Sequence, residues 1–164
     1  MNIPLKVHAV ISDPNTEAQI VILKDEQNIE LLPIWVGMTE GNAIRFAMEG
    51  IVPQRPLTHD LLKDILGHLG AQIEKVVIHD LNNNTYFATL YLLRRKSTEA
   101  HAEEESGEPF EMTIDARPSD AIALALRARV PIYVTEEVLR RKSSENLDEW
   151  LERLKPKDIG PYNA

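Results

Sequence analysis

The stretch MTIDARPSDAIALAL, residues Met112–Leu126, carries an alternating strand directly into an alanine-rich helix. In an extended chain this alternation places the apolar side chains on one face and Asp115 on the other. Four polar side chains stand within the six residues of the junction, namely Asp115, Arg117, Ser119 and Asp120. A hydrophobic core requires none of them. The junction is therefore our first candidate for a site that handles phosphates, metal ions or protons.

Alternating or continuous apolar runs on either side of this stretch predict further strands. They cover Leu5–Ile11, Gln19–Leu23, Glu30–Val36, Lys75–His79, Tyr86–Leu93 and Pro131–Thr135. Three asparagines, residues 82–84, separate the fourth and fifth of these runs. Since asparagine tolerates a positive φ, we predict a hairpin there.

Apolar side chains three and four residues apart predict helices between the strands. Thr39 is the expected N-cap of the first helix, and the second begins near Thr58. Their apolar stripes are Ile44, Ala47, Met48 and Ile51 in the first, and Leu62, Ile65, Leu66 and Leu69 in the second. A third helix is predicted over Ser119–Arg129. Because the helices interrupt the strands irregularly, the pattern favours an α+β fold, with a mixed or antiparallel sheet packed with three core helices.

Residues 1–138 are assigned to this domain, and residues 139–164 to a C-terminal helical extension. The extension has an apolar stripe of Leu147, Trp150, Leu151 and Leu154. We expect the stripe to pack on the core or on a second subunit, and a homodimer is the commonest closed assembly. The acidic segment Glu99–Pro109 has few apolar residues and is predicted to be an exposed, mobile loop.

The composition narrows the class of protein. With 164 residues the chain is long enough for one domain with a real core, and without cysteine it has no disulfide or thiolate metal site. No apolar run is long enough to cross a membrane and no secretory signal is visible, so we expect a cytoplasmic protein without a membrane partner. The net charge of −8 argues against broad, charge-driven binding of nucleic acid. Basic clusters at Arg127/Arg129 and Arg140–Lys142 are typical of solvated faces, and they also allow a local polyanion track.

Three acidic residues stand at predicted helix starts: Glu40, Asp60 and Asp120. Acids there stabilise the positive end of the helix dipole, which is a sufficient reason for any one of them. Asp115 lacks this explanation because it ends a strand. Asp115 and Asp120, with Glu40 or Asp60 nearby, would form a carboxylate set suited to Mg²⁺ or Mn²⁺, which prefer oxygen ligands.

Arg55 and Arg117 each precede a proline. The proline biases the arginine away from helix, so its guanidinium projects from a defined turn. Arginine binds phosphate oxygens in a two-pronged way. The alternative is an ion pair with a carboxylate, for example Arg117 with Asp60 or Arg55 with Asp120, and we give the two interpretations equal weight.

Two histidines are candidates for proton transfer. His59 stands between Thr58 and Asp60 at a helix start, where the dipole favours a neutral imidazole able to accept a proton. His79 ends a strand beside Asp80. A lone histidine is more often a local hydrogen-bonding residue than a catalyst. No HExxH, Walker, GxGxxG or GxSxG pattern occurs, which counts against zincins, P-loop NTPases, simple Rossmann enzymes and α/β-hydrolases.

Five segments form a recognisable pattern in a fixed order. They are LPIWVGMTEGNAIRFAMEG (32–50), RPLTHDLL (55–62), VVIHDLNNNTYFATL (76–90), IDARPSDAIALALR (114–127) and PIYV (131–134). Together they resemble the bifunctional nuclease (BFN) domain family, over roughly Leu5–Val138. The family's polar signature maps here onto Glu40, Arg55, Pro56, Thr58, His59, Asp60, His79, Asp115, Arg117, Pro118, Ser119 and Asp120.

This resemblance implies an α+β domain found in bacteria and plants, whose plant members act as nucleases on both RNA and DNA. The first functional hypothesis is accordingly a phosphodiesterase. A divalent ion, Mg²⁺ or Mn²⁺, would polarise the phosphate and lower the pKa of the attacking water. A variant without metal is possible for RNA, where the 2′-hydroxyl is the nucleophile. We predict catalytic roles for His59, Arg55, Arg117, Asp115 and Asp120, and metal ligation by Glu40, Asp60, Asp115 and Asp120.

The second hypothesis is a non-catalytic binding or regulatory module. The same polar residues would then hold helix starts and turns together by salt bridges. The net charge favours this module, whereas the density of charged residues at the turns and the family resemblance favour the nuclease. We adopt the nuclease, with nucleic acid as its partner, as the working hypothesis.

Overall fold

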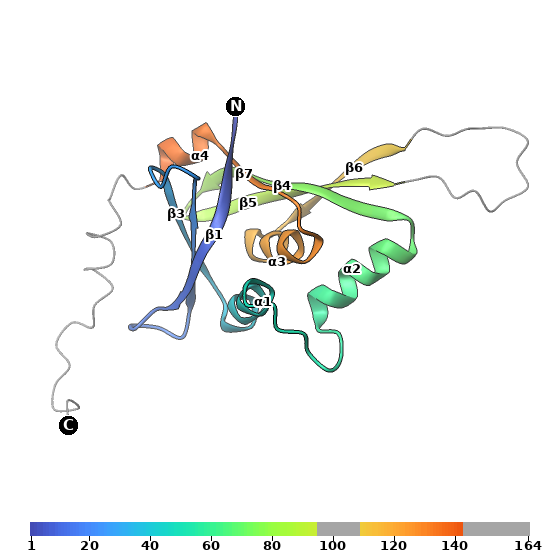
Figure 1. Ribbon diagram of the computed structural model, residues 1–164. Helices are drawn as coiled ribbons and strands as arrows, with labels where there is room; N and C mark the ends of the chain where they lie inside the picture. The colour runs from blue at the N-terminus through green and yellow to red at the C-terminus, as the bar shows by residue number, and fades with distance from the viewer. Residues whose placement is uncertain (95–108, 143–164) are drawn as a thin grey trace, which may run out of the picture.

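A seven-stranded mixed sheet carries the fold in the computed structural model, which describes residues 1–94 and 109–142 (Figure 1). Its strands are β1 (Asn2–Ser12), β2 (Gln19–Lys24), β3 (Leu31–Val36), β4 (Ala71–Asn82), β5 (Thr85–Arg94), β6 (Phe110–Ala116) and β7 (Ile132–Thr135). The helices are α1 (Met38–Met48), α2 (Thr58–His68), α3 (Pro118–Ala128) and α4 (Glu136–Arg141). The α+β class, the mixed sheet and the three core helices are as predicted.

The strand order is β3-β2-β1-β7-β4-β5-β6, and every neighbouring pair is antiparallel except β4 and β7. β1 changes partner along its length: residues 2–5 pair with β7 and residues 6–12 pair with β2. Figure 1 shows β1–β3 running across the direction of β4–β7, with α1 and α3 on the inner side of the bend. The predicted hairpin joins β4 to β5, and Asn83 and Asn84 both have positive φ values, 48° and 60°.

α3 lies at the centre of the core because the middle of its sequence is apolar on all sides. Residues 121–125 are consecutive and all buried, with exposures of 0–4%. A helical segment with no polar side can be accommodated only where other elements surround it. Pro118 occupies the first helical position, and Arg129 ends the helix in the left-handed conformation at φ 57°. The start of α3 is therefore fixed against the rest of the domain.

Two details of the helices differ from the sequence-based expectation. Gly37, not Thr39, is the N-cap of α1, so the helix begins earlier than its polar residues suggested. The apolar stripe of α2 is largely exposed in the described structure, with Leu62 at 41% and Leu69 at 63%, and the buried residue of this helix is His59. Periodicity predicted the helix correctly but could not show which face has a partner.

Other expectations fall at the edge of the described residues or beyond them. α4 crosses residue 138, where we expected the extension to begin, and its Val138 and Leu139 are buried in the core. The stripe at residues 147–154 and nearly all of the predicted loop at 99–109 lie outside the described residues. No helix within residues 1–94 and 109–142 is long and apolar enough to span a membrane.

Gly41 provides a test of the packing between α1 and β2. A Cβ atom at Gly41 would lie 2.5 Å from both Cβ and Cγ of Gln19. Gln19 is held by Arg45, which donates to its Oε1 at 2.7 Å, so it cannot move aside freely. Gly41→Ala is expected to lower the free energy of unfolding by about 2 kcal/mol, as overpacking does. Gly67→Ala is the matched control: this α2 position has nothing within 4 Å, so alanine should stabilise by up to about 1 kcal/mol in denaturant unfolding. Equal effects at the two positions would contradict the packing.

Candidate functional site

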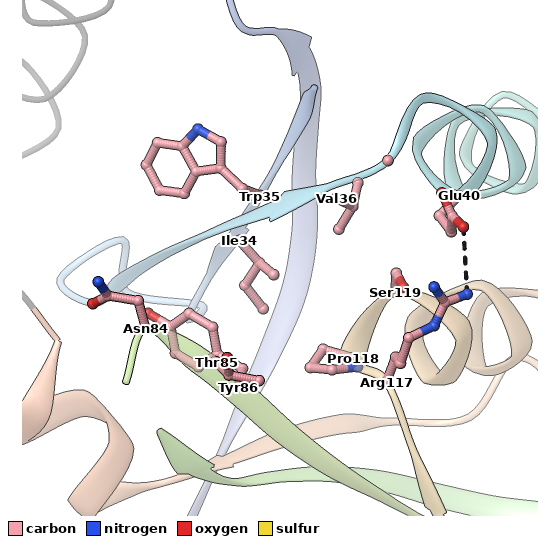
Figure 2. A pocket seen from close by; sticks show the side chains of 11 residues that line it. Ile34, Trp35, Val36, Glu40, Asn84, Thr85, Tyr86, Arg117, Pro118 and Ser119 are labelled. Atoms are coloured by element: carbon pink, nitrogen blue, oxygen red, sulfur yellow. Dashed lines mark hydrogen bonds and ion pairs between the residues drawn. The ribbon is translucent and has the colours of Figure 1, made fainter. Parts of the chain in front are cut away.

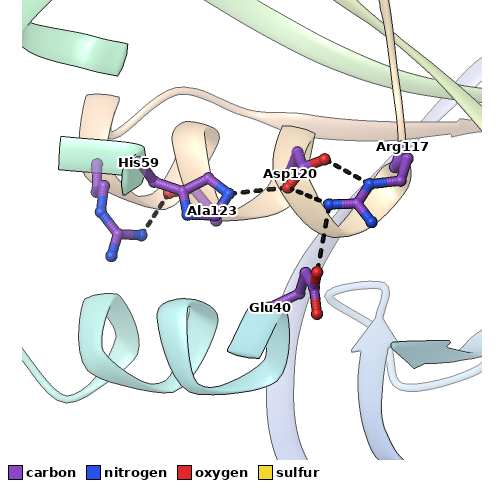
Figure 3. A network of polar contacts seen from close by, with 6 residues as sticks. Glu40, His59, Arg117, Asp120 and Ala123 are labelled. Carbon is purple, nitrogen blue, oxygen red and sulfur yellow. Dashed lines mark hydrogen bonds and ion pairs between the residues drawn. The ribbon is translucent and has the colours of Figure 1, made fainter. Parts of the chain in front are cut away.

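A chain of polar contacts, here called the Asp120 network, links the starts of α1, α2 and α3 (Figure 3). Asp120 is at its centre: Oδ1 lies 2.9 Å from Nε2 of His59, and Oδ2 accepts from Nε of Arg117 at 2.7 Å. Nη2 of Arg117 donates to Oδ1 of Asp120 at 3.1 Å and to Oε1 of Glu40 at 3.3 Å. Four of the predicted site residues, separated by up to 80 positions from Glu40 to Asp120 in sequence, are thus brought together.

Local sequence explains how each side chain reaches the network. Pro118 fixes the first turn of α3 and leaves Arg117 extended as the N-cap, with φ −65° and ψ 142°. Asp120 is three residues later, on the same side of the helix start, so Arg117 folds back onto it. Glu40 has the corresponding position in α1. A Cβ atom on Gly37 would lie 2.3 Å from Oε2 of Glu40, so a side chain there would require this carboxylate to move from its present position.

Asp120 is a carboxylate in this setting. Burial by itself would raise the pKa of Asp120, but the hydrogen bonds and charges of Arg117 and His59 outweigh burial and hold that pKa below its usual value. Asp120 and Glu40 in turn raise the pKa of the Arg117 guanidinium, which stays charged. An ionised carboxylate only accepts hydrogen bonds, so Nε2 of His59 carries the hydrogen between them. His59 is 7% exposed, and it therefore acts on Asp120 rather than on solvent.

A second ion pair joins α2 to the far end of α3. Oδ1 of Asp60 accepts from Nε of Arg127 at 2.7 Å, and Oδ2 accepts from the backbone N–H of Leu57 at 2.9 Å. The side chain of Arg127 is only 9% exposed and also donates to the carbonyl of Ala123. Arg127 is therefore not part of a solvated face.

Arg117 does form ion pairs with carboxylates, but they are those of Asp120 and Glu40. The two example pairs given from sequence, Arg117 with Asp60 and Arg55 with Asp120, are wrong. His59 and Asp60 are neighbours in the first turn of α2, yet they meet α3 at opposite ends of that helix. Asp60 pairs with Arg127 because of the way α2 crosses α3, and neither helix sequence alone indicates how the two cross.

The free energy of unfolding should fall in acid because the carboxylates of Asp60 and Asp120 are both paired with arginines. Burial acts to raise the pKa of Asp60, but Arg127, the Leu57 amide and His59 together lower it below its usual value of 3.8. A carboxylate with a lowered folded-state pKa contributes stability above the unfolded-state pKa and loses it as the pH falls through the folded-state pKa. We therefore expect the free energy of unfolding to decline as the pH falls below about 5. Denaturant titrations across this range, with Asp60→Asn as a comparison, should show a steeper decline for the wild type; identical slopes would exclude Asp60 as a source.

Three predicted residues lie apart from the Asp120 network. Asp115 is on the exposed face of β6 opposite Thr89, Arg55 is in the exposed linker between α1 and α2, and His79 is exposed where the β4 register shifts. Their side chains make no hydrogen bond or ion pair with any residue in the described ranges. A part for Arg55 or Asp115 in the chemistry stays a prediction.

The predicted metal ligands do not form one group. Among residues 1–94 and 109–142, no three histidine or carboxylate side chains lie close enough together to hold a metal ion. Glu40 and Asp120 share Arg117, Asp60 is bound to Arg127, and Asp115 is on another face. Ligation of Mg²⁺ or Mn²⁺ by these four residues remains a prediction.

Arg117 and Glu40 also line a pocket of about 390 Å³, here called the β3–α3 pocket (Figure 2). Its other walls are β3, the β4–β5 hairpin and the start of α3. Asp60 and Arg127 line a different pocket, so Asp60 and Arg117 do not share one cleft. Sequence reasoning missed Tyr86 of the β3–α3 pocket, because a tyrosine at a hairpin end has no distinguishing pattern. It also missed Gly37, although a glycine three residues before an acidic residue at a helix start could have indicated this position.

Comparison with known proteins identifies the family of the chain. The model of the bifunctional nuclease domain matches residues 21–146, which include the whole Asp120 network. The chain belongs to the bifunctional nuclease domain family. An uncharacterized protein of Mycobacterium tuberculosis is 38% identical over 120 residues, which are 73% of this chain and 63% of that protein. Bifunctional nuclease 1 of Oryza sativa subsp. indica is 30% identical over 119 residues, 72% of this chain and 33% of the rice protein.

A second plant relative is covered to a similar extent as the rice protein. Bifunctional nuclease 2 of Arabidopsis thaliana is 30% identical over 118 residues, 71% of this chain and 32% of the plant protein. The chain thus spans less than two thirds of the mycobacterial relative and about one third of the plant ones.

Proposed function

We propose that the chain hydrolyses phosphodiester bonds in nucleic acid, with Arg117 holding the phosphate. The observation that carries this proposal is the Asp120 network, which fixes a guanidinium that is 65% exposed beside the β3–α3 pocket. The rice and Arabidopsis relatives named bifunctional nuclease support the same class of reaction. RNA and DNA are both proposed substrates.

Arg117 retains free donors for a phosphate. Its Nε and Nη2 are engaged by Asp120 and Glu40, whereas Nη1, with two N–H groups, makes no hydrogen bond within the described structure. The positive end of the α3 dipole lies beside it. Guanidinium and helix start would together stabilise the negative charge that grows on the phosphate oxygens as the attacking oxygen bonds to phosphorus.

Glu40 is the proposed general base. Its Oε1 lies 3.3 Å from Nη2 of Arg117, so a phosphate on Arg117 would bring the attacking water, or the 2′-hydroxyl of RNA, within reach of this carboxylate. The proton passes to Glu40 as the new oxygen–phosphorus bond forms. The bond from phosphorus to the departing sugar oxygen breaks, and that oxygen takes a proton from solvent. His59 and Asp120 are positioning residues, since they hold Arg117 in place.

A divalent ion is not written into this mechanism. The two carboxylates nearest the phosphate, Glu40 and Asp120, are both engaged by Arg117, so the donor set does not fit Mg²⁺ or Mn²⁺ without rearrangement. We derive no step through a metal.

A non-catalytic binding module is the second candidate, and one observation favours it. Asp60 and Asp120 each have both carboxylate oxygens engaged by hydrogen bonds, as expected of residues that join helices. On this view the network is structural and the exposed face of α2 is a surface for a partner.

A homodimer and a cytoplasmic location are also proposed, and the mass of the purified chain in solution tests the homodimer.

The deciding experiment is direct cleavage. Labelled RNA, single-stranded DNA and double-stranded DNA are incubated with the purified chain in Mg²⁺, in Mn²⁺ and in chelator, beside Asp120→Ala. Cleavage by the wild type that is absent in Asp120→Ala supports the nuclease. Cleavage by the wild type that persists in chelator supports the reaction without metal. Absence of cleavage under all three conditions would leave the binding module as the function.

A further inference from the structure

The β3–α3 pocket has a polar end formed by two helix starts. The first helical hydrogen bond of α3 runs from the N–H of Ala121 to the carbonyl of Arg117, and that of α1 runs from Gly41 to Gly37. Amides that precede these bonds, including those of Ser119 and Asp120, have no helical acceptor. They form, with the positive dipole ends of both helices, a favourable environment for an anion.

Ser119 supplies an independent sign of a ligand at this end. It is 6% exposed and lines the pocket, yet its hydroxyl has no hydrogen-bond partner among residues 1–94 and 109–142. Buried hydroxyls are normally paired, because an unpaired one is costly. Figure 2 shows its side chain rising from the start of α3 towards Val36 and Glu40, beside the guanidinium of Arg117. A phosphate oxygen there would satisfy this hydroxyl.

The opposite end of the pocket combines apolar side chains with polar residues of the β4–β5 hairpin, Asn84, Thr85 and Tyr86. Ile34 and Tyr86 stand there, across the pocket from Pro118 (Figure 2). The phenol of Tyr86 makes no hydrogen bond to a described residue, and burial raises its pKa so that it stays a neutral donor. Trp35 does not contribute its ring, since Figure 2 shows the indole on the other face of β3 from Ile34.

We propose that the β3–α3 pocket binds one unpaired nucleotide, with its phosphate at Arg117 and Ser119 and its base against Tyr86. The inference rests on the proposed function and identifies the part of the substrate that the site recognises. A volume of about 390 Å³ is in the range of small-ligand sites. A base enters such a pocket only when it is out of its stack, so unpaired strands are the preferred substrates.

The carboxylate of Glu40 disfavours a bound phosphate, so replacing it should change the affinity in a known direction. Its carboxylate lines the same pocket and lies against Arg117, so it repels an anion there. Glu40→Gln should strengthen the binding of a nucleoside monophosphate while it abolishes cleavage, because the amide keeps the size but cannot accept the proton. A structural role alone predicts no gain in binding.

The test is calorimetric titration of the full chain with a nucleoside 5′-monophosphate, the nucleoside alone and inorganic phosphate. We expect the monophosphate to bind more tightly than either part. Tyr86→Leu should weaken its binding about 5- to 100-fold, the range for loss of base stacking on an aromatic side chain, and Ser119→Ala should weaken it as well. Tyr91→Leu is the control, since Tyr91 is five residues along the same strand on the opposite face, over Lys75. Thermal unfolding checks that each variant is folded.

The outcomes separate this inference from the proposed function. Nucleotide binding that is lost in Tyr86→Leu supports the pocket even if no substrate is cleaved, and only the nuclease is then rejected. Cleavage of single strands with equal kcat/KM in wild type, Tyr86→Leu and Ser119→Ala overturns the pocket and leaves the nuclease intact. Equal affinity for inorganic phosphate and the monophosphate overturns the base-binding part.

Discussion

Arg117→Lys is expected to lower the rate of phosphodiester cleavage by about 100- to 1,000-fold, the loss seen when one donor to a developing oxyanion is removed. Lysine keeps the charge but has a single nitrogen. Arg117 engages Asp120 through Nε and Nη2 and Glu40 through Nη2, and only then has Nη1 left for substrate. Lysine cannot make the two carboxylate contacts and the phosphate contact in that geometry. The loss should appear mainly in kcat, measured on labelled single strands.

Arg140→Lys is the control for this change. Arg140 is 77% exposed on α4, and within residues 1–94 and 109–142 its one ion pair is a loose contact with Glu136, at 3.8 Å, so lysine should leave cleavage unchanged. Retention of more than about half the wild-type rate in Arg117→Lys would contradict the role of Arg117 as phosphate ligand. A parallel loss of melting temperature and activity would instead favour the structural interpretation of the network.

Asp60→Asn is expected to lower the free energy of unfolding by about 3 kcal/mol, because it leaves Arg127 as a charge without its partner in a site that excludes most water. The variant also weakens the contact to the amide of Leu57 at the start of α2. Asp64→Asn, one turn later at an exposed position of the same helix, should change stability by less than about 0.5 kcal/mol. Chemical denaturation of the two variants measures the difference.

A double variant shows whether the cost arises from the unpaired charge. Asp60→Asn combined with Arg127→Leu removes both partners, and replacement of a buried ion pair by apolar side chains is often nearly neutral. The double variant should therefore recover most of the stability lost in Asp60→Asn. If it is less stable than either single variant, packing rather than charge accounts for the effect.

Local patterns were sufficient for the strands and the central helix. Alternation of apolar residues predicted β1 and β5 within a few residues, and the helix predicted over Ser119–Arg129 is found as α3 at Pro118–Ala128. The exposure of α2 could not be predicted, since an apolar stripe at helical spacing looks the same whether or not another element covers it. The sheet order was equally beyond reach, because the pairing of β7 with β1 and β4 depends on residues more than 50 positions away.

The site shows the same division between local and distant contacts. The pairing of Arg117 with Asp120 joins residues three apart and follows from the geometry of one helix turn. The pairing of Asp60 with Arg127 depends on how α2 crosses α3, for which neither segment has a sequence signal. Spacing alone therefore identified candidate residues but could not predict which carboxylate pairs with which arginine.

The position of β7 has a consequence for synthesis on the ribosome. β7 is the last strand of the described sheet to be made, yet it lies in the middle of that sheet, between β1 and β4. Until it emerges, β1–β3 and β4–β6 are two separate ribbons, and β1 and β4 expose the edges that will later hold it. Open edges are prone to pair with other chains. The nascent protein is therefore prone to aggregation until β7, a strand of four residues, has been made. Any delay before β7 emerges prolongs the exposure of these edges.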